Sequence, residues 1–218
     1  MKTSRFCIFL SLSIALLSCS KDNIKVACIG NSITFGHGIA NREKEAYPAV
    51  LGQLLGERFE VKNYGVSGRT VMNSSDMPYM AEAAYQEALA FNPNIVTIKL
   101  GTNDSKPYNW LHQENFKSDL ITLISSFQAL PSNPDIYLCL PAPAMGNAWN
   151  ISDSVIFHGI IPIIKEVVKE NKLKLIDLYT PLKSHPEYFP DTIHPNEEGS
   201  KQIARIIFQA ITGKAKNI

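Results

Sequence analysis

The residues in this sequence best suited to chemistry are a serine near its start and an aspartate–histidine pair near its end. Ser32 lies in ACIGNSITFGHG, residues 27–38, where an apolar run meets glycine and asparagine, which favour turns. Asp191 and His194 lie three residues apart in DTIHP. A serine hydroxyl is a weak nucleophile unless a base takes its proton, and histidine titrates near neutrality. With Asp191 fixing the ring tautomer, His194 is a candidate base for Ser32.

Attack on a carbonyl also needs hydrogen-bond donors for the negative charge that develops on its oxygen. The candidates are the amides of Ser32 and Gly68, the latter in NYGVSGRT, and the side-chain amide of Asn103 in GTND. Each residue type is common in turns, so each motif alone has a purely structural explanation. Because all of them occur in one chain, together with the aspartate–histidine pair, the sequence favours catalysis.

These motifs follow short apolar runs that alternate with longer amphipathic ones. The pattern predicts strands over residues 24–30, 59–65, 94–100, 135–141 and 173–178. It predicts helices near residues 46–58, 77–91, 112–130, 154–171 and 195–212. Strands buried on both faces and alternating with helices are typical of a parallel sheet covered on two sides. We therefore expect an α/β fold, a flavodoxin-like three-layer sandwich with a five-stranded parallel sheet, whose site lies beyond the carboxyl ends of the strands.

The four motifs GNSIT, NYGVSGRT, GTND and DTIHP, in this order, resemble the conserved blocks of the SGNH hydrolases, also called GDSL esterases and lipases. The resemblance implies a triad of Ser32, His194 and Asp191, with an oxyanion hole from Ser32, Gly68 and Asn103. The first block departs from the commoner pattern, because Asn31 stands where an aspartate usually precedes the serine. The G-x-S-x-G elbow of the α/β-hydrolases is absent.

The first two blocks also resemble the carbohydrate or sialate O-acetylesterase branch of the family. Loops after the third and fourth predicted strands carry aromatic residues, which suit sugar rings. The sequence therefore favours a serine esterase that removes small acyl groups, chiefly acetyl, from glycans such as sialic acids or plant polysaccharides. The residues expected to contact substrate are Asn31, Arg69, Tyr108, Trp110 and Trp149. Arg69 has two interpretations, as the partner of a substrate carboxylate or of an internal acid.

Three other functions stay open. A lipase, lysophospholipase or thioesterase of the same family would need a cleft for a long acyl chain. A non-catalytic glycan-binding lipoprotein would keep the fold, but its triad would be expected to be broken. A nucleotide-binding protein of flavodoxin-like form would be expected to carry a phosphate loop, and the sequence lacks that motif.

The N-terminus has the pattern of an export signal. Lys2 and Arg5 precede an apolar run over residues 6–17, which is too short to span a bilayer. The run ends in LLSCS, which resembles a bacterial lipobox and implies cleavage before Cys19 and lipidation of that residue. We thus expect a signal peptide over 1–18, a lipidated tether over 19–23 and the hydrolase domain over 24–218. We expect the protein to lie at the outer membrane of a bacterium, where the N-terminal lipid anchor holds it.

The composition and charge of the chain limit the classes of partner and cofactor that it is expected to bind. The 218 residues carry a formal net charge of +1, which gives no electrostatic case for nucleic acid. Cys28 and Cys139 lie in apolar runs and are expected to be buried thiols rather than ligands. No metal spacing is present, and serine chemistry needs no cofactor, so none is predicted. The sequence leaves the oligomeric state undetermined.

Overall fold

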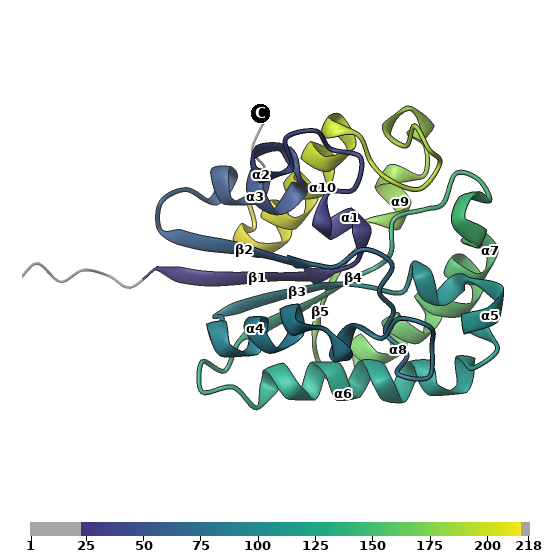
Figure 1. Ribbon diagram of the computed structural model, residues 1–218. Helices are drawn as coiled ribbons and strands as arrows, with labels where there is room; N and C mark the ends of the chain where they lie inside the picture. The colour runs from purple at the N-terminus through teal and green to yellow at the C-terminus, as the bar shows by residue number, and fades with distance from the viewer. Residues whose placement is uncertain (1–22, 215–218) are drawn as a thin grey trace, which may run out of the picture.

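The computed structural model describes residues 23–214, which form a parallel sheet between two layers of helices (Figure 1). The predicted signal peptide, Cys19 and most of the predicted tether lie outside these residues. No helix among the described residues has the length and apolar character needed to cross a membrane.

The sheet confirms the predicted five parallel strands. In spatial order they are β2 (Phe59–Gly65), β1 (Ile24–Gly30), β3 (Ile95–Lys99), β4 (Asp135–Cys139) and β5 (Lys174–Ile176). The strand order reverses direction between β1 and β3, because β2 lies on one side of β1 and all later strands on the other. In open sheets of this kind, ligands bind at the carboxyl ends of the strands next to such a reversal.

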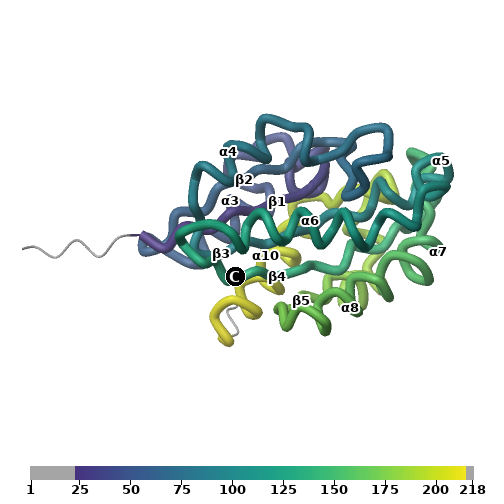
Figure 2. Tube along the Cα trace, turned by 90° about the horizontal axis from the view of Figure 1, so that it is seen from below, coloured from purple at the N-terminus to yellow at the C-terminus, as the bar shows by residue number. Residues whose placement is uncertain are grey.

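Alternate residues of the central strands enter two separate cores, as expected for strands buried on both faces. On β1, Val26 and Cys28 face the core formed with α3 (Tyr47–Leu55) and α10 (Glu197–Thr212). Ala27 and Ile29 face the core formed with α4 (Ala83–Phe91), α6 (Phe116–Gln128) and α8 (Ile161–Glu170). Figure 1 shows these two helical layers above and below the sheet, and Figure 2 views the α4, α6 and α8 layer from below.

The longer helices are α3 (Tyr47–Leu55), α4 (Ala83–Phe91), α6 (Phe116–Gln128), α8 (Ile161–Glu170) and α10 (Glu197–Thr212). Short helices sit mostly in the connections: α1 (Ser32–Phe35), α2 (Arg42–Glu45), α5 (Pro107–Trp110), α7 (Asp153–Val155) and α9 (Tyr179–Leu182). The 3-10 turns are η1 (Tyr79–Ala81), η2 (Asn103–Ser105), η3 (Gln113–Asn115), η4 (Ala148–Asn150) and η6 (Pro186–Tyr188), and η5 (Ile156–Ile160) is a π-helical turn.

Two predicted helices are interrupted. The helix predicted over 77–91 begins only at Ala83, because Glu82 is extended and separates it from η1. The helix predicted over 154–171 contains the π turn η5 between α7 and α8. Within η5, a Cβ on Gly159 would lie 2.6 Å from the indole of Trp110. The turn therefore brings helical backbone against that side chain, a close approach that glycine permits.

The end of β2 packs directly on α1. A Cβ added at Gly65 would overlap the backbone of Thr34 and Phe35. The side chain of Asn63 joins the two elements, since its Nδ2 donates to the Thr34 carbonyl at 2.8 Å and its Oδ1 accepts from the Gly65 amide at 2.9 Å. The helix that begins with Ser32 is thus fixed from beneath by the edge strand.

This packing predicts that Gly65→Ala lowers the free energy of unfolding by about 1–3 kcal/mol, because the added methyl group must displace backbone. Urea unfolding measures the change. The matched control is Gly52→Ala in α3, where the new Cβ would lie at an ordinary 3.5 Å from Val61 and helix propensity favours alanine. Equal stabilities for the two variants would contradict the close contact of β2 with α1.

Candidate active site

The structure brings Ser32, from near the start of the described chain, together with Asp191 and His194, from near its end. Ser32 begins α1, directly after β1, and its Oγ lies 2.9 Å from Nε2 of His194. Nδ1 of His194 lies 2.6 Å from Oδ2 of Asp191. The three side chains therefore form one hydrogen-bonded chain, Ser32–His194–Asp191, as the sequence predicted they would. This is the geometry in which a histidine takes a serine proton and an aspartate orients the ring.

The loop before α10 holds the histidine and aspartate by its own backbone. Oδ1 of Asp191 accepts hydrogen bonds from the amides of Ile193 at 2.9 Å and of His194 at 2.6 Å. Thr192 has a φ of 71°, a conformation that a threonine adopts only when its surroundings enforce it. The helix itself starts later, where the Asn196 side chain accepts from the Gly199 amide at 2.9 Å. The Asp191 carboxylate therefore binds and orients His194, and it does not cap α10.

The surroundings keep His194 neutral and Asp191 charged. Burial lowers the pKa of His194 below its usual 6.5 and outweighs the opposing effect of Asp191. Burial alone would raise the pKa of Asp191, but hydrogen bonds from the amide and ring of His194 and from the Ile193 amide hold it below its usual value. A neutral imidazole beside a carboxylate is the state needed in a general base.

The predicted oxyanion donors border the same cavity. This cavity has a volume of about 210 Å³ and is lined by Ser32, His37, Ser67, Gly68, Asn103, Lys106, Trp149, Ile151 and His194. Gly68 has a φ of 84°, which glycine adopts without strain. Asn103 is 4% exposed, and its Nδ2 donates one hydrogen to the Arg69 carbonyl at 3.1 Å. The second hydrogen of that amide is left for a ligand in the cavity.

A buried carboxylate, which the sequence did not single out, shapes the loop beyond Gly68. Oδ1 of Asp104 accepts from the amides of Val71 at 2.8 Å and Met72 at 3.0 Å. Burial raises the pKa of Asp104 to about 7, although these hydrogen bonds oppose the rise. The GTND motif therefore supplies both Asn103, at the cavity, and the anchor of the loop that carries Gly68.

Trp149 is the predicted substrate contact that lines the cavity. Its side chain is 59% exposed, and its indole lies edge-on to the rings of His37 at 6.1 Å and His194 at 6.0 Å. The His37 ring in turn lies 4.3 Å from the His194 ring. His37 lies between Gly36 and Gly38, and glycines on both sides indicate only a loop. Its proximity to the base comes from the fold.

The other predicted substrate contacts do not line the cavity. Arg69 donates to Glu82 at 2.6 and 2.8 Å, so the internal acid is its partner. Trp110 packs edge-on against Phe116 in the core. Tyr108 is 46% exposed in α5, with the ammonium of Lys106 over its ring. These aromatic and charged residues have mainly structural partners in the described chain.

Asn31 is also not a substrate contact, because it is fully buried beneath Ser32. Its Oδ1 accepts from the Ile33 amide at 3.2 Å and thereby caps α1. The same oxygen accepts from Nζ of Lys99 at 3.3 Å, and that ammonium also donates to Thr102 Oγ1 at 3.3 Å. Lys99 is itself fully buried, and burial lowers its pKa to about 7.

One group of described side chains has the spacing of metal ligands. The ligand atoms of His37, Asp191 and His194 all lie within 4.8 Å of one another. Both ring nitrogens of His194 already have partners, Ser32 and Asp191. A metal bound here would therefore compete with the hydrogen-bonded chain.

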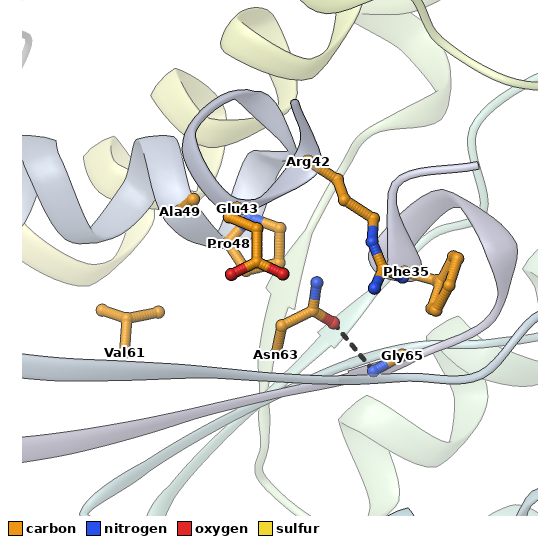
Figure 3. A pocket seen from close by; sticks show the side chains of 8 residues that line it. All are labelled: Phe35, Arg42, Glu43, Pro48, Ala49, Val61, Asn63 and Gly65. Carbon is orange, nitrogen blue, oxygen red and sulfur yellow. Dashed lines mark hydrogen bonds between the residues drawn. The ribbon is translucent and has the colours of Figure 1, made fainter. Parts of the chain in front are cut away.

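A second groove lies between β2 and the helices α2 and α3, next to Phe35 of α1 (Figure 3). Its volume is about 420 Å³, and it is lined by Phe35, Arg42, Glu43, Pro48, Ala49, Val61, Asn63 and Gly65. The guanidinium of Arg42 lies 3.9 Å above the Phe35 ring, and Glu43 projects toward Asn63 in Figure 3. No member of the Ser32–His194–Asp191 chain lines this groove, so it is distinct from the candidate active site.

A three-layer α/β/α fold with a serine–histidine–aspartate chain at the carboxyl edge of its sheet has the form of a serine hydrolase. The sequence matches the GDSL-like lipase/acylhydrolase family over residues 28–202, and the chain belongs to that family. The resemblance seen in the four motifs is thus confirmed.

Relatives and structural neighbours agree with this placement. The chain is 47% identical over 209 residues to an acetylxylan esterase of Xylanibacter ruminicola, covering 88% of this chain and 44% of that protein. It thus spans less than half the length of this curated relative. A lipase/acylhydrolase of Enterococcus faecalis superposes with a TM-score of 0.70 at 23% identity, over 89% of this chain and 99% of the other. A carbohydrate acetylesterase of Sinorhizobium meliloti superposes with a TM-score of 0.67 at 16% identity, over 87% and 98%. At these identities the two structures show the shared fold.

Proposed function

We propose that this chain is a serine esterase that removes small acyl groups, chiefly acetyl, from glycans. The observation that carries the proposal is the hydrogen-bonded chain of Ser32, His194 and Asp191 on the wall of a 210 Å³ cavity. Neither a non-catalytic binding protein nor a nucleotide-binding protein needs this arrangement. Because serine performs the chemistry, the reaction as proposed uses no cofactor.

In the proposed reaction Ser32 Oγ attacks the ester carbonyl while His194 Nε2 takes the serine proton. The carbonyl oxygen becomes an oxyanion, for which the amides of Ser32 and Gly68 and the side chain of Asn103 are the donors. His194 then returns its proton to the departing sugar oxygen, which leaves an acyl group on Ser32. Water activated by His194 releases the acid and restores the serine.

Cavity size and wall chemistry support a small acyl group on a sugar. The cavity is smaller than the roughly 300–1,000 Å³ of pockets that enclose drug-sized ligands. The exposed face of Trp149 suits a sugar ring, and Lys106 offers a donor to its hydroxyls. The similarity to an acetylxylan esterase favours a plant polysaccharide over a sialic acid. Arg69, the residue best suited to a sialic acid carboxylate, is held by Glu82.

The test compares nitrophenyl esters from acetyl to palmitoyl with acetylated xylo-oligosaccharides and acetylated sialosides, with Ser32→Ala as the blank. We expect a preference for acetyl among the nitrophenyl esters, and acetate release from the xylo-oligosaccharides. A preference for palmitoyl would favour the lipase alternative. No turnover of any ester above the blank, with retained binding of the oligosaccharide, would favour the non-catalytic glycan-binding protein.

Asn103→Ala is expected to lower kcat by about 100- to 1,000-fold, because it removes one donor to the oxyanion. KM should change much less, since the donor is strongest for the charged transition state. Steady-state kinetics on nitrophenyl acetate measure both constants. Asn109→Ala is the matched control, because Asn109 is equally buried and donates to the Asn103 carbonyl but does not line the cavity. Equal losses in the two variants would assign Asn103 a structural role.

We propose further that the protein is exported and anchored to the outer membrane of a bacterium by lipid on Cys19. The support is the basic and apolar pattern of residues 2–17 and the LLSCS motif. Metabolic labelling with a tagged fatty acid should mark the wild-type protein but not Cys19→Ser. Labelling of both proteins, or of neither, would contradict the anchor.

A further inference from the structure

A buried lysine lies directly beneath the nucleophile turn without a counter-charge. Lys99 ends β3 and pairs in register with Gly30, the residue that precedes Asn31. Its ammonium has two hydrogen-bond partners, Asn31 Oδ1 and Thr102 Oγ1, both neutral and both at 3.3 Å. Within residues 23–214, Lys99 makes no ion pair with a carboxylate. Burying an unpaired ammonium costs several kcal/mol of stability, so a lysine here calls for an explanation.

The titratable groups around Lys99 do not supply the missing charge. Lys99 shares its sheet face with Thr97 and with the core that contains Cys28 of β1, Tyr47 of α3 and Cys139 of β4. Burial raises the pKa of Cys28 to about 12 and raises those of Cys139 and Tyr47, so all three are neutral near pH 7. Because burial lowers the pKa of Lys99 to about 7, the lysine carries its positive charge in the acid range where His194 takes up a proton, and these neutral neighbours do not balance that charge.

Two observations connect this charge with the reaction. Asn31 Oδ1 joins the ammonium to the amide of Ile33, which holds the first turn of α1 behind Ser32. Burial is the main cause that lowers the pKa of His194, and Asp191 raises it; the nearby His37 and then the charge of Lys99 lower it further. An aspartate at position 31 would pair with the ammonium and cancel its field, but the neutral Asn31 leaves it in place.

We infer that Lys99 is a positioning residue that fixes Asn31 under the nucleophile and, by its charge, contributes to the pH range over which His194 acts as a base. A positive charge at this depth opposes the imidazolium in the free enzyme and favours the alkoxide and oxyanion that form on the other side of the reaction. It also explains why asparagine replaces the commoner aspartate in the first motif. This inference rests on the proposed roles of Ser32 and His194.

The first test is Lys99→Met, which keeps an unbranched side chain of nearly the same length and removes its charge and donors. The expected result is a kcat lowered by roughly tenfold or more with KM changed by less than about twofold. The acid limb of kcat/KM should move to higher pH, because His194 loses a repelling charge. The melting temperature near pH 7 should be unchanged or raised, because methionine removes an unpaired buried charge.

The second test is Asn31→Asp, which keeps Lys99 and adds a counter-charge at 3.3 Å from its ammonium. The acid limb should move in the same direction as in Lys99→Met, although the side chain at position 99 is intact. The matched control is Thr97→Val, a buried change two residues earlier on the same face of β3, for which the limb should stay at the wild-type pH.

An acid limb at the wild-type pH in both Lys99→Met and Asn31→Asp would overturn the inference. Loss of stability and activity together in Lys99→Met would also overturn the inference. A mere disturbance of β3 would cause that result, and it would cause the same loss in Thr97→Val. Failure of the proposed function would give a different result. In that case Ser32→Ala would keep its esterase activity, whereas the inference about Lys99 requires Ser32→Ala to be inactive.

Discussion

Replacing Ser32 with alanine is expected to lower ester hydrolysis by about 10⁴-fold or more while the protein stays folded. Oγ of Ser32 is the atom that would form the acyl-enzyme, and no other hydroxyl is hydrogen-bonded to His194 in the described chain. The change removes one oxygen from a residue at the cavity wall, so packing is hardly altered. Initial rates on nitrophenyl acetate measure the loss, and circular dichroism checks the fold.

The matched control for Ser32 is Ser67→Ala, which removes a hydroxyl from the same cavity wall but from a residue with no proposed chemical role. Its activity should fall far less than that of Ser32→Ala. If Ser32→Ala kept a substantial part of the wild-type rate, the serine mechanism would be wrong. If both variants lost activity equally, a general disturbance of the cavity would be the better explanation.

Replacing His194 with alanine is expected to cause a loss of similar size, because an unassisted serine hydroxyl is a poor nucleophile. Residues that act as a unit are not additive, so the Ser32→Ala/His194→Ala double variant should be no slower than either single variant. Added imidazole should restore part of the activity of His194→Ala, and none of that of Ser32→Ala. Restoration in neither variant together with additive losses would argue against a coupled pair.

The same histidine sets the expected response to acid. Because burial lowers the pKa of His194 below 6.5, the neutral base should persist on acidification past that pH, and activity should be lost only below it. His37 also lowers the pKa of His194, to a smaller extent than burial does, so His37→Ala should move the acid limb to higher pH and keep much of the rate. A wild-type acid limb above 6.5 would contradict the assignment.

Much of the fold could be predicted from the sequence, because apolar runs and their alternation with amphipathic segments are local patterns that repeat along the chain. The bounds predicted for the first two strands, 24–30 and 59–65, are those of β1 and β2. Continuous apolar runs indicated burial on both faces, and the alternation with helices indicated a parallel sheet. Parallel strands end at one edge, so motifs that follow strands were expected to meet there. The structure brings them together as expected.

The errors concern the directions and partners of single side chains. Trp110 and Trp149 have the same residue type and lie in predicted loops after neighbouring strands, yet one packs in the core and the other lines the cavity. Arg69 donates a hydrogen bond to Glu82, thirteen positions later, and the hydrophobic periodicity of the sequence does not predict the turn that brings the two together. Asn31 points down to Lys99 and not out to substrate. Such pairings depend on tertiary packing, which overrides local pattern.

The most direct test of the central assignment is covalent labelling with a fluorophosphonate, followed by peptide mapping. The reagent phosphonylates a serine only where a base activates it. We expect one modified residue, Ser32, with rapid labelling of the wild-type protein, slow labelling of His194→Ala and no labelling of Ser32→Ala. Labelling of a different serine, or equal rates in wild-type protein and His194→Ala, would contradict a nucleophile at Ser32 that His194 activates.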